Sequence, residues 1–234
     1  MTGDNSLPVG NKRQGRAVFL MISLFLLLVL YPVSEYIPWG GILIPLGFSL
    51  MLISATWAVR SNRRVLLMVS VPGLVWLALT WLGTLMRFPE NVDVVKYISL
   101  TVFVLLILGL MILSILRTEH VTNNTICRAV STYLLIGIAW FLIYTLIMRY
   151  NSGAFRLNTT AGIEKAQLAA SDLLYMSFCT LTTLGYGDII PASPLARGLV
   201  MLEATIGPLY LAILLARLMG LYLTSQRQGK TRED

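Results

Sequence analysis

The sequence predicts an all-α membrane protein with six transmembrane helices and a short re-entrant helix between the fifth and the sixth. Three observations predict this fold class. Of the 234 residues, 56% are hydrophobic and only 12% are charged, about half the charged share of a soluble globular chain. The mean hydropathy is +0.76. The charged residues are also clustered, so that long apolar stretches separate the clusters.

Six apolar stretches approach or exceed the roughly 20 residues that a helix needs to cross the hydrocarbon core. The predicted spans are 17–37, 40–59, 65–86, 97–116, 128–148 and 195–223. The first span follows Lys12, Arg13 and Arg16, as the apolar part of a signal peptide also does. Its apolar run continues to Ile37 without a small-x-small cleavage pattern. We therefore expect an uncleaved first helix.

Basic residues predict the orientation, because Lys and Arg are enriched on the cytoplasmic side of membranes. They cluster at 12–16, 60–64, 117–128 and 227–232, which all fall on one side of the six predicted spans. On the other side, basic residues are mixed with acidic ones. We therefore predict that both termini are cytoplasmic.

Composition also excludes several function classes. One histidine and two cysteines are too few for a zinc site, a haem ladder or a di-iron centre. The net charge of +7 comes from residues that adjoin apolar runs, where they set topology, so nucleic acid is not an expected partner. No His-Glu metal motif is present, and His120 falls in a predicted cytoplasmic loop. An enzyme is the least expected class.

The connection at 149–194 differs from a simple loop. It begins polar and becomes apolar from about Ala169 to Leu184, a stretch too short to span. A helix is expected from 172 to about 182, with Ser171 or Asp172 as its cap. Non-helical backbone at membrane depth is tolerated only where protein buries it or where it lines water. This re-entrant segment is therefore where we expect function.

The expected helix is followed by residues 183–188, which read Thr-Leu-Gly-Tyr-Gly-Asp and are called here the TLGYGD segment. The carboxyl end of a helix carries partial negative charge, which favours a cation. Stripping water from a cation requires a row of carbonyl oxygens facing one axis. Gly185 and Gly187 allow the unusual dihedrals that such a row demands, Tyr186 can brace it from behind, and the Thr183 hydroxyl can add a ligand.

Together with Thr180, the TLGYGD segment resembles the potassium-channel signature Thr-Val-Gly-Tyr-Gly-Asp, whose carbonyls replace the hydration shell of K⁺. Leu184 stands where that family usually has Val or Ile, and its side chain is expected to point away from the pore. The last span, over 202–220, resembles the inner helix of bacterial six-span channels, with Pro208 in place of a residue that is often Gln. The other interpretation of the segment is a tight glycine turn in an extracellular loop.

The resemblance implies a passive, potassium-selective channel. The carbonyls of Thr183, Leu184, Gly185 and Tyr186 would bind K⁺ as the permeant ion, and Gly187 would shape the outer mouth. No cofactor is implied. Because each chain carries one such segment and the family surrounds the ion with four, a homotetramer embedded in membrane lipids is expected. The resemblance also implies a bacterial inner (plasma) membrane.

The matching motifs cover about 128–223, and the first 127 residues match only in helix count. The expected division is therefore into five parts. They are a cytoplasmic segment at 1–16, a four-helix transmembrane domain at 17–116, a cytoplasmic linker at 117–127, a pore domain at 128–223 and a cytoplasmic tail at 224–234.

Five further residues carry alternatives. Asp188 is expected to attract cations at the outer mouth, or to be an exposed loop charge. Glu203 is a carboxylate within a span, expected either to support the filter or to pack as a neutral acid against the pore helix. Gly207 and Pro208 suggest a gating hinge or a fixed bend. Arg217 is expected to snorkel toward lipid headgroups, with a role in gating as the alternative.

No predicted span among 40–59, 65–86 and 97–116 carries the Arg or Lys repeat that a voltage sensor needs, so gating by an arginine sensor is not expected. Three rivals stay open. A potassium transporter subunit usually carries four imperfect filter repeats, a weakly selective cation channel usually lacks the tyrosine seen here at position 186, and a membrane sensor or scaffold could keep a vestigial pore.

Overall fold

The structure is a computed structural model that describes residues 9–58, 63–85, 90–118, 121–158 and 168–230. Its helices are α1 (Val9–Val33), α2 (Gly40–Ala58), α3 (Arg63–Leu85), α4 (Glu90–Leu116), α5 (Asn123–Tyr150), α6 (Ala170–Leu181) and α7 (Pro194–Lys230), with a 3₁₀ turn at Ser34–Tyr36. Two short strands, β1 (Phe155–Leu157) and β2 (Ile189–Pro191), complete it. His120 lies outside the described residues.

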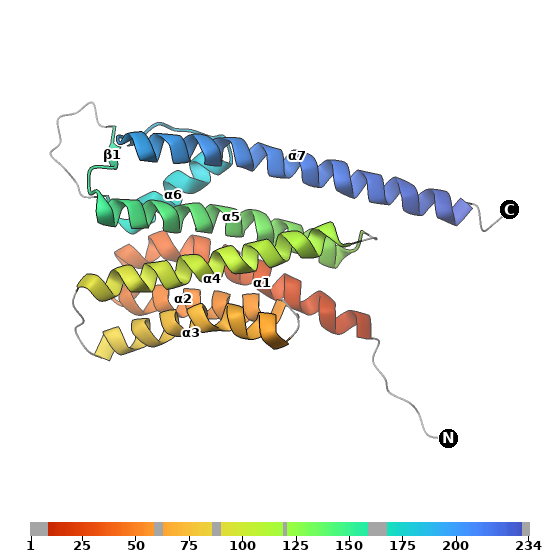
Figure 1. Ribbon diagram of the computed structural model, residues 1–234, viewed down its shortest axis with the longest axis horizontal. Coiled ribbons are helices and arrows are strands. Elements are labelled where there is room, and N and C mark those ends of the chain that lie inside the picture. Colours follow the sequence, from red (N-terminus) through yellow and green to blue (C-terminus); the bar gives the residue numbers. More distant parts are fainter. Residues whose placement is uncertain (1–8, 59–62, 86–89, 119–120, 159–167, 231–234) are drawn as a thin grey trace, which may run out of the picture.

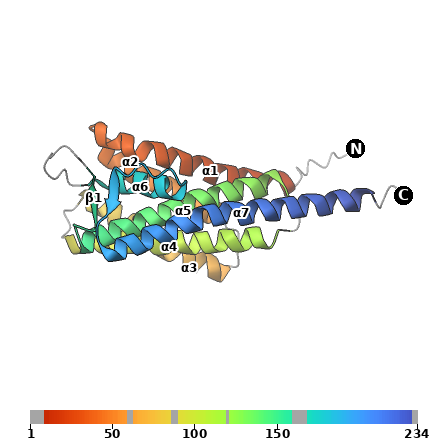
Figure 2. The ribbon, with the colours of Figure 1, turned by 90° about the horizontal axis from the view of Figure 1, so that it is seen from above.

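Six helices in the described part of the chain are long and apolar enough to cross a membrane, which confirms the six predicted spans. They are α1, α2, α3, α4, α5 and α7, and they mark the chain as a membrane protein. The first part of α1 and the last part of α7 lie at the same end of the bundle in both views (Figures 1 and 2). This agrees with termini on one side of the membrane.

Several helix ends differ from the sequence prediction. Helix α5 begins at Asn123, inside the expected 117–127 linker, because Thr122 caps it and exchanges hydrogen bonds with Thr125. Helix α7 continues to Lys230, into the expected tail. Helix α6 begins at Ala170, ahead of both expected caps. Asp172 instead accepts a hydrogen bond of 2.9 Å from the backbone N–H of Ala169, one residue before the helix.

Helix α5 is the centre of the packing. It lies between the bundle of α1–α4 and the pair formed by α6 and α7 (Figure 1), and it contacts α1, α4, α6 and α7. Its membrane-length window is the most buried of the six, and that of α7 is the least buried. Large side chains at the centre of this packing, among them Phe103, Ile107, Phe141 and Leu142, have almost no exposed surface.

Helix α6 is 12 residues long, which corresponds to about 18 Å against a hydrocarbon core of about 30 Å. It lies beside α5 and α7 near the β1 end of the molecule (Figures 1 and 2). Strands β1 and β2 pair antiparallel, with Arg156 opposite Ile190. This pairing joins the chain after α5 to the chain after the TLGYGD segment and so fixes where that segment ends.

Candidate functional site

The TLGYGD segment begins by closing the carboxyl end of α6. The backbone N–H groups of Leu184 and Gly185 both donate to the carbonyl oxygen of Cys179, at 2.9 and 3.1 Å. The N–H of Thr183 donates to the carbonyl oxygen of Thr180 at 3.0 Å. These bonds satisfy carbonyls that a helix end leaves without a partner. They also hold the start of the segment against the carboxyl end of α6.

The backbone of the segment alternates between two conformations. Thr183, Gly185 and Gly187 have φ angles of 61°, 55° and 75°, whereas Leu184 and Tyr186 are not among the positive-φ residues. Two of the three positive angles fall on glycines, as expected. The third costs strain at Thr183, which the sequence did not predict.

The carbonyl oxygens of this backbone are available to a ligand. Among the described residues, none donates a hydrogen bond to the carbonyls of Thr183, Leu184, Gly185 or Tyr186, and all four residues are exposed. Unpaired backbone carbonyls are hard oxygen ligands without net charge. The chemistry that fits them is the binding of a cation by partial negative charges.

The outer end of the segment is held by Asn158, which directly follows β1. Its side-chain amide donates to the carbonyl oxygen of Gly187 at 3.0 Å, and its backbone N–H donates to the carbonyl oxygen of Asp188 at 2.7 Å. The Asp188 carboxylate is exposed and accepts from the N–H of Ile189 at 3.0 Å. The Asn158 contact could not be predicted from the sequence, because only the β1–β2 register brings these residues together.

Two side chains of the segment face other elements. The ring of Tyr186 stacks on that of Tyr175 in α6, with centroids 6.4 Å apart and planes 12° apart. Leu184 lines an apolar pocket of about 370 Å³ together with Leu28 and Pro32 of α1. The substitution of Leu for the usual Val or Ile therefore changes a surface that the first helix also borders.

Glu203 is fully buried where α5, α6 and α7 meet. One carboxyl oxygen accepts a hydrogen bond of 2.5 Å from the Tyr144 hydroxyl, and the other accepts one of 2.6 Å from Ser177. The Ser177 hydroxyl also lies 2.8 Å from the carbonyl oxygen of Gly137. Glu203 thus contacts α6 rather than the TLGYGD segment itself. Tyr144 and Ser177 were missed because in an apolar span they look like ordinary packing residues.

Gly207 lets α7 approach α6 closely. A Cβ atom at this position would lie 2.3 Å from the carbonyl oxygen of Leu181, the last residue of α6. The same oxygen accepts a hydrogen bond of 3.2 Å from the Tyr133 hydroxyl. Pro208 is exposed, and α7 continues through it without a break. The structure therefore gives Gly207 a close contact with α6 and leaves Pro208 exposed.

Comparison with known proteins places the site in a recognised kind of domain. A family model described as "Ion channel" matches residues 142–223. The protein described as inward rectifier potassium channel Kirbac3.1, from Paramagnetospirillum magnetotacticum, is 36% identical over an alignment of 91 residues. The alignment covers 34% of this chain and 29% of that protein. The match thus spans less than a third of the relative's length. No solved structure matches the chain at a significant level.

The matched range contains α6, the TLGYGD segment, Glu203 and most of α7. The site residues that the sequence predicted therefore all lie within the range that the family model matches, and α1–α4 precede that range. Residues 142–223 of this chain are therefore similar to an ion channel domain, and further helices of membrane-spanning length precede them.

Proposed function

We propose that this protein is a potassium-selective channel that conducts K⁺ passively and has no enzymatic cycle. One observation carries the proposal: the TLGYGD backbone alternates in φ and presents unpaired carbonyls directly after the carboxyl end of α6. In the proposed pore, the carbonyls of Thr183, Leu184, Gly185 and Tyr186 replace the hydration shell of K⁺. The similarity of this region to a potassium channel supports the choice of ion.

Helix α6 is the proposed re-entrant pore helix. It is too short to span, and the chain returns from the TLGYGD segment to β2, which pairs with the strand that precedes α6. Its carboxyl end, with partial negative charge, then faces the ion path. Gly187 shapes the outer mouth, and Asp188 raises the local concentration of cations there.

A closed fourfold homotetramer is the proposed assembly. One TLGYGD segment can supply ligands from one side of an ion only, so copies around a symmetry axis are needed to surround it. The largely exposed apolar surface of α7 is available for contact with other copies and with lipid. Residues 17–116 would form the periphery, without an arginine voltage sensor.

Three residues have proposed supporting roles. Glu203 holds α6 in place through Ser177, and so supports the filter indirectly. Gly207 and Pro208 form the proposed hinge of α7. Gly207 fixes the preceding part of the helix against α6, and Pro208 lacks the N–H that would donate to the carbonyl of Ala204. The proposed location is a bacterial inner membrane with both termini in the cytoplasm.

The test is ion flux from proteoliposomes that contain the purified protein, with K⁺ compared against Na⁺. We expect a barium-sensitive K⁺ flux that exceeds the Na⁺ flux and that is lost in Gly185→Ala, because alanine is strained at φ 55°. Gly198→Ala is the matched control, since a Cβ there meets nothing within 4 Å and its φ is ordinary. Equal K⁺ and Na⁺ fluxes, or an active Gly185→Ala, would contradict the proposal.

A further inference from the structure

Arg217 lies in residues 209–230 of α7, which are called here the lower half of the helix. The sequence predicted that its side chain reaches lipid headgroups, but the guanidinium donates hydrogen bonds to backbone carbonyls of the protein instead. Its Nη2 donates to the carbonyl oxygen of Leu116, the last residue of α4, and to that of Thr118 at 3.3 Å. Carbonyls at a helix carboxyl end lack intrahelical partners, and a cation there is favoured by the helix dipole. Helix α4 has no basic residue within its last turn, although Arg117 follows it directly. Arg217 therefore adds a cation from another helix to this carboxyl end.

Further polar contacts join the last turn of α4, the first turns of α5 and the middle of α7. The Nη1 of Arg128 in α5 donates to the hydroxyl of Ser114 in α4 at 2.6 Å. The Tyr210 hydroxyl in α7 donates to the carbonyl oxygen of Ala129 in α5 at 2.8 Å. The lower half of α7 is therefore bonded to α4 by Arg217 and to α5 by Tyr210.

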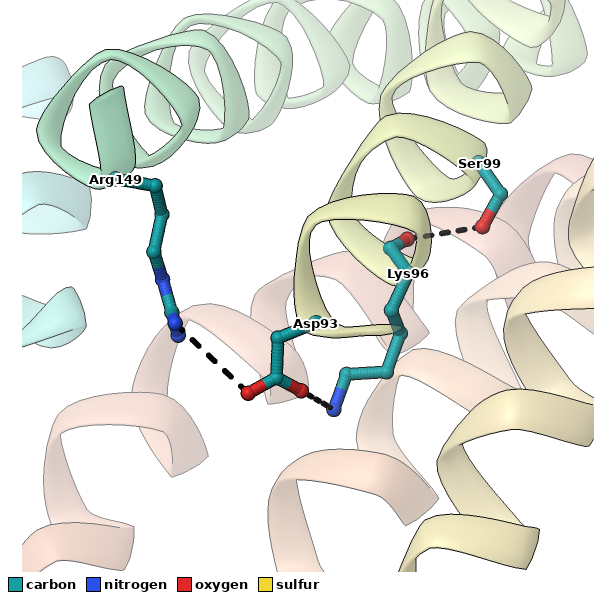
Figure 3. A network of polar contacts seen from close by, with 4 residues as sticks. All are labelled: Asp93, Lys96, Ser99 and Arg149. Carbon is teal, nitrogen blue, oxygen red and sulfur yellow. Dashed lines mark hydrogen bonds and ion pairs between the residues drawn. The ribbon is translucent and has the colours of Figure 1, made fainter. Parts of the chain in front are cut away.

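The opposite end of α4 is also fixed to the channel domain. Asp93 lies between Lys96, at 2.8 Å, and Arg149 of α5, at 3.8 Å (Figure 3). The Arg149 guanidinium also lies 5.2 Å from the centre of the Tyr97 ring. Helix α4 thus runs alongside α5 with polar contacts near both ends. It is suited to transmit a displacement of the bundle along its length.

We propose that α4 couples the α1–α4 bundle to the pore, and that Arg217 is the residue through which it holds the lower half of α7. The inference rests on the proposed channel function and adds its regulation. Above the Gly207–Pro208 pair, α7 is fixed to α6 by Glu203 through Ser177. Below it, α7 exposes most of its apolar surface. A swing of the lower half about this pair must therefore break the Arg217 bonds.

The direction of the effect follows from the position of α4. Helix α4 packs on α3 and α5, and it lies in the α1–α4 bundle, across α5 from the α6–α7 pair (Figure 1). In a fourfold assembly around the TLGYGD segments, the Arg217 contact therefore draws α7 outward, away from the axis. Loss of the contact lets the lower halves of α7 approach the axis and narrows the ion path.

The test compares Arg217→Gln with Arg64→Gln, which removes the same charge from an exposed residue at the start of α3. We expect K⁺ flux in proteoliposomes to fall about tenfold in Arg217→Gln, which corresponds to about 1.4 kcal/mol, with an unchanged ratio of K⁺ to Na⁺ flux. Arg64→Gln should conduct like the wild type. Arg217→Lys keeps the cation and should recover part of the flux.

A second variant tests the contact separately from the charge. Thr118→Cys combined with Arg217→Cys should conduct poorly, and bridging the two thiols with a short bifunctional methanethiosulfonate should restore flux until dithiothreitol removes the bridge. Wild-type protein treated with the same reagent is the control. An Arg217→Gln flux equal to that of Arg64→Gln, or a bridge that leaves flux unchanged, would overturn the coupling. Equal K⁺ and Na⁺ fluxes through the wild-type protein would instead contradict the proposed channel function.

Discussion

At the residue scale, the buried carboxyl of Glu203 sets the strongest demand on its neighbours. It has no exposed surface, and its hydrogen bonds come from two hydroxyl groups on two other helices. A polar group buried without partners costs far more than a hydrogen bond returns. Glu203 therefore needs the Tyr144 and Ser177 hydroxyls as hydrogen-bond donors, and Tyr144 needs the Glu203 carboxyl as an acceptor. Together the three side chains link α5, α6 and α7.

Glu203→Ala should destabilise the protein, because it leaves the Tyr144 hydroxyl without its acceptor, leaves Ser177 with only the Gly137 carbonyl oxygen, and opens a cavity. Each unsatisfied buried group costs about 1–3 kcal/mol, so we expect a clear drop in the midpoint of thermal unfolding in detergent. Glu203→Gln keeps an acceptor oxygen of the same shape and should lose much less. Thr205→Ala, on an exposed face of α7, is the control. A Glu203→Ala protein as stable as this control would contradict the account.

The sequence predicted the residues of this site better than their contacts. The TLGYGD order, the glycine positions and an intramembrane carboxylate at 203 are all readable from one chain, because each is a local departure from an apolar pattern. The partners Ser177, Tyr144 and Asn158 are not readable, since they depend on helix crossings and on the β1–β2 register. For the same reason, Arg217 was assigned to lipid rather than to α4.

At the element scale, α6 is held between two helices that approach it through glycines. A Cβ atom on Gly137 of α5 would lie 2.7 Å from the Phe178 ring, and one on Gly207 of α7 would lie 2.3 Å from the Leu181 carbonyl oxygen. The existence of α6 and its length were predictable from a short apolar run. The close approach was not, because a glycine within a span signals flexibility and packing equally.

Gly207→Ala should force α7 away from the end of α6, since the methyl group meets a backbone oxygen that cannot rotate away. Overpacking of this kind costs about 1–3 kcal/mol, and we expect a lower thermal midpoint. Gly198→Ala in the same helix meets nothing within 4 Å and should be neutral or stabilising, because alanine favours helix over glycine by about 1 kcal/mol. Equal midpoints for the two variants would show that Gly207 has no packing role.

At the scale of the whole molecule, the burial of the helices is uneven. Helix α5 is enclosed by its neighbours, whereas α7 leaves most of its apolar length uncovered, including Leu202, Ile206, Leu209 and Ile213. In the proposed assembly, α7 helices of four copies line a common axis, and lipid or neighbouring copies cover the remainder. Nothing in a single sequence specifies which of these surfaces meet, although one TLGYGD segment per chain implies the number of copies.

The protein extracted in mild detergent should therefore have the mass of four chains by native mass spectrometry. Each chain has a mass of 26.0 kDa, so neighbouring stoichiometries are well separated. A uniform monomer or dimer that still conducts K⁺ would contradict the fourfold pore.

The most direct test of the central claim is the reversal potential of the wild-type protein in a planar bilayer with KCl on one side and NaCl on the other. If the TLGYGD carbonyls select K⁺, the current should reverse close to the potassium equilibrium potential, and barium should block it. A reversal potential near zero would mean that the two cations pass equally well. That result would contradict the account, because carbonyls that replace the hydration shell of K⁺ should not accept Na⁺ with equal ease.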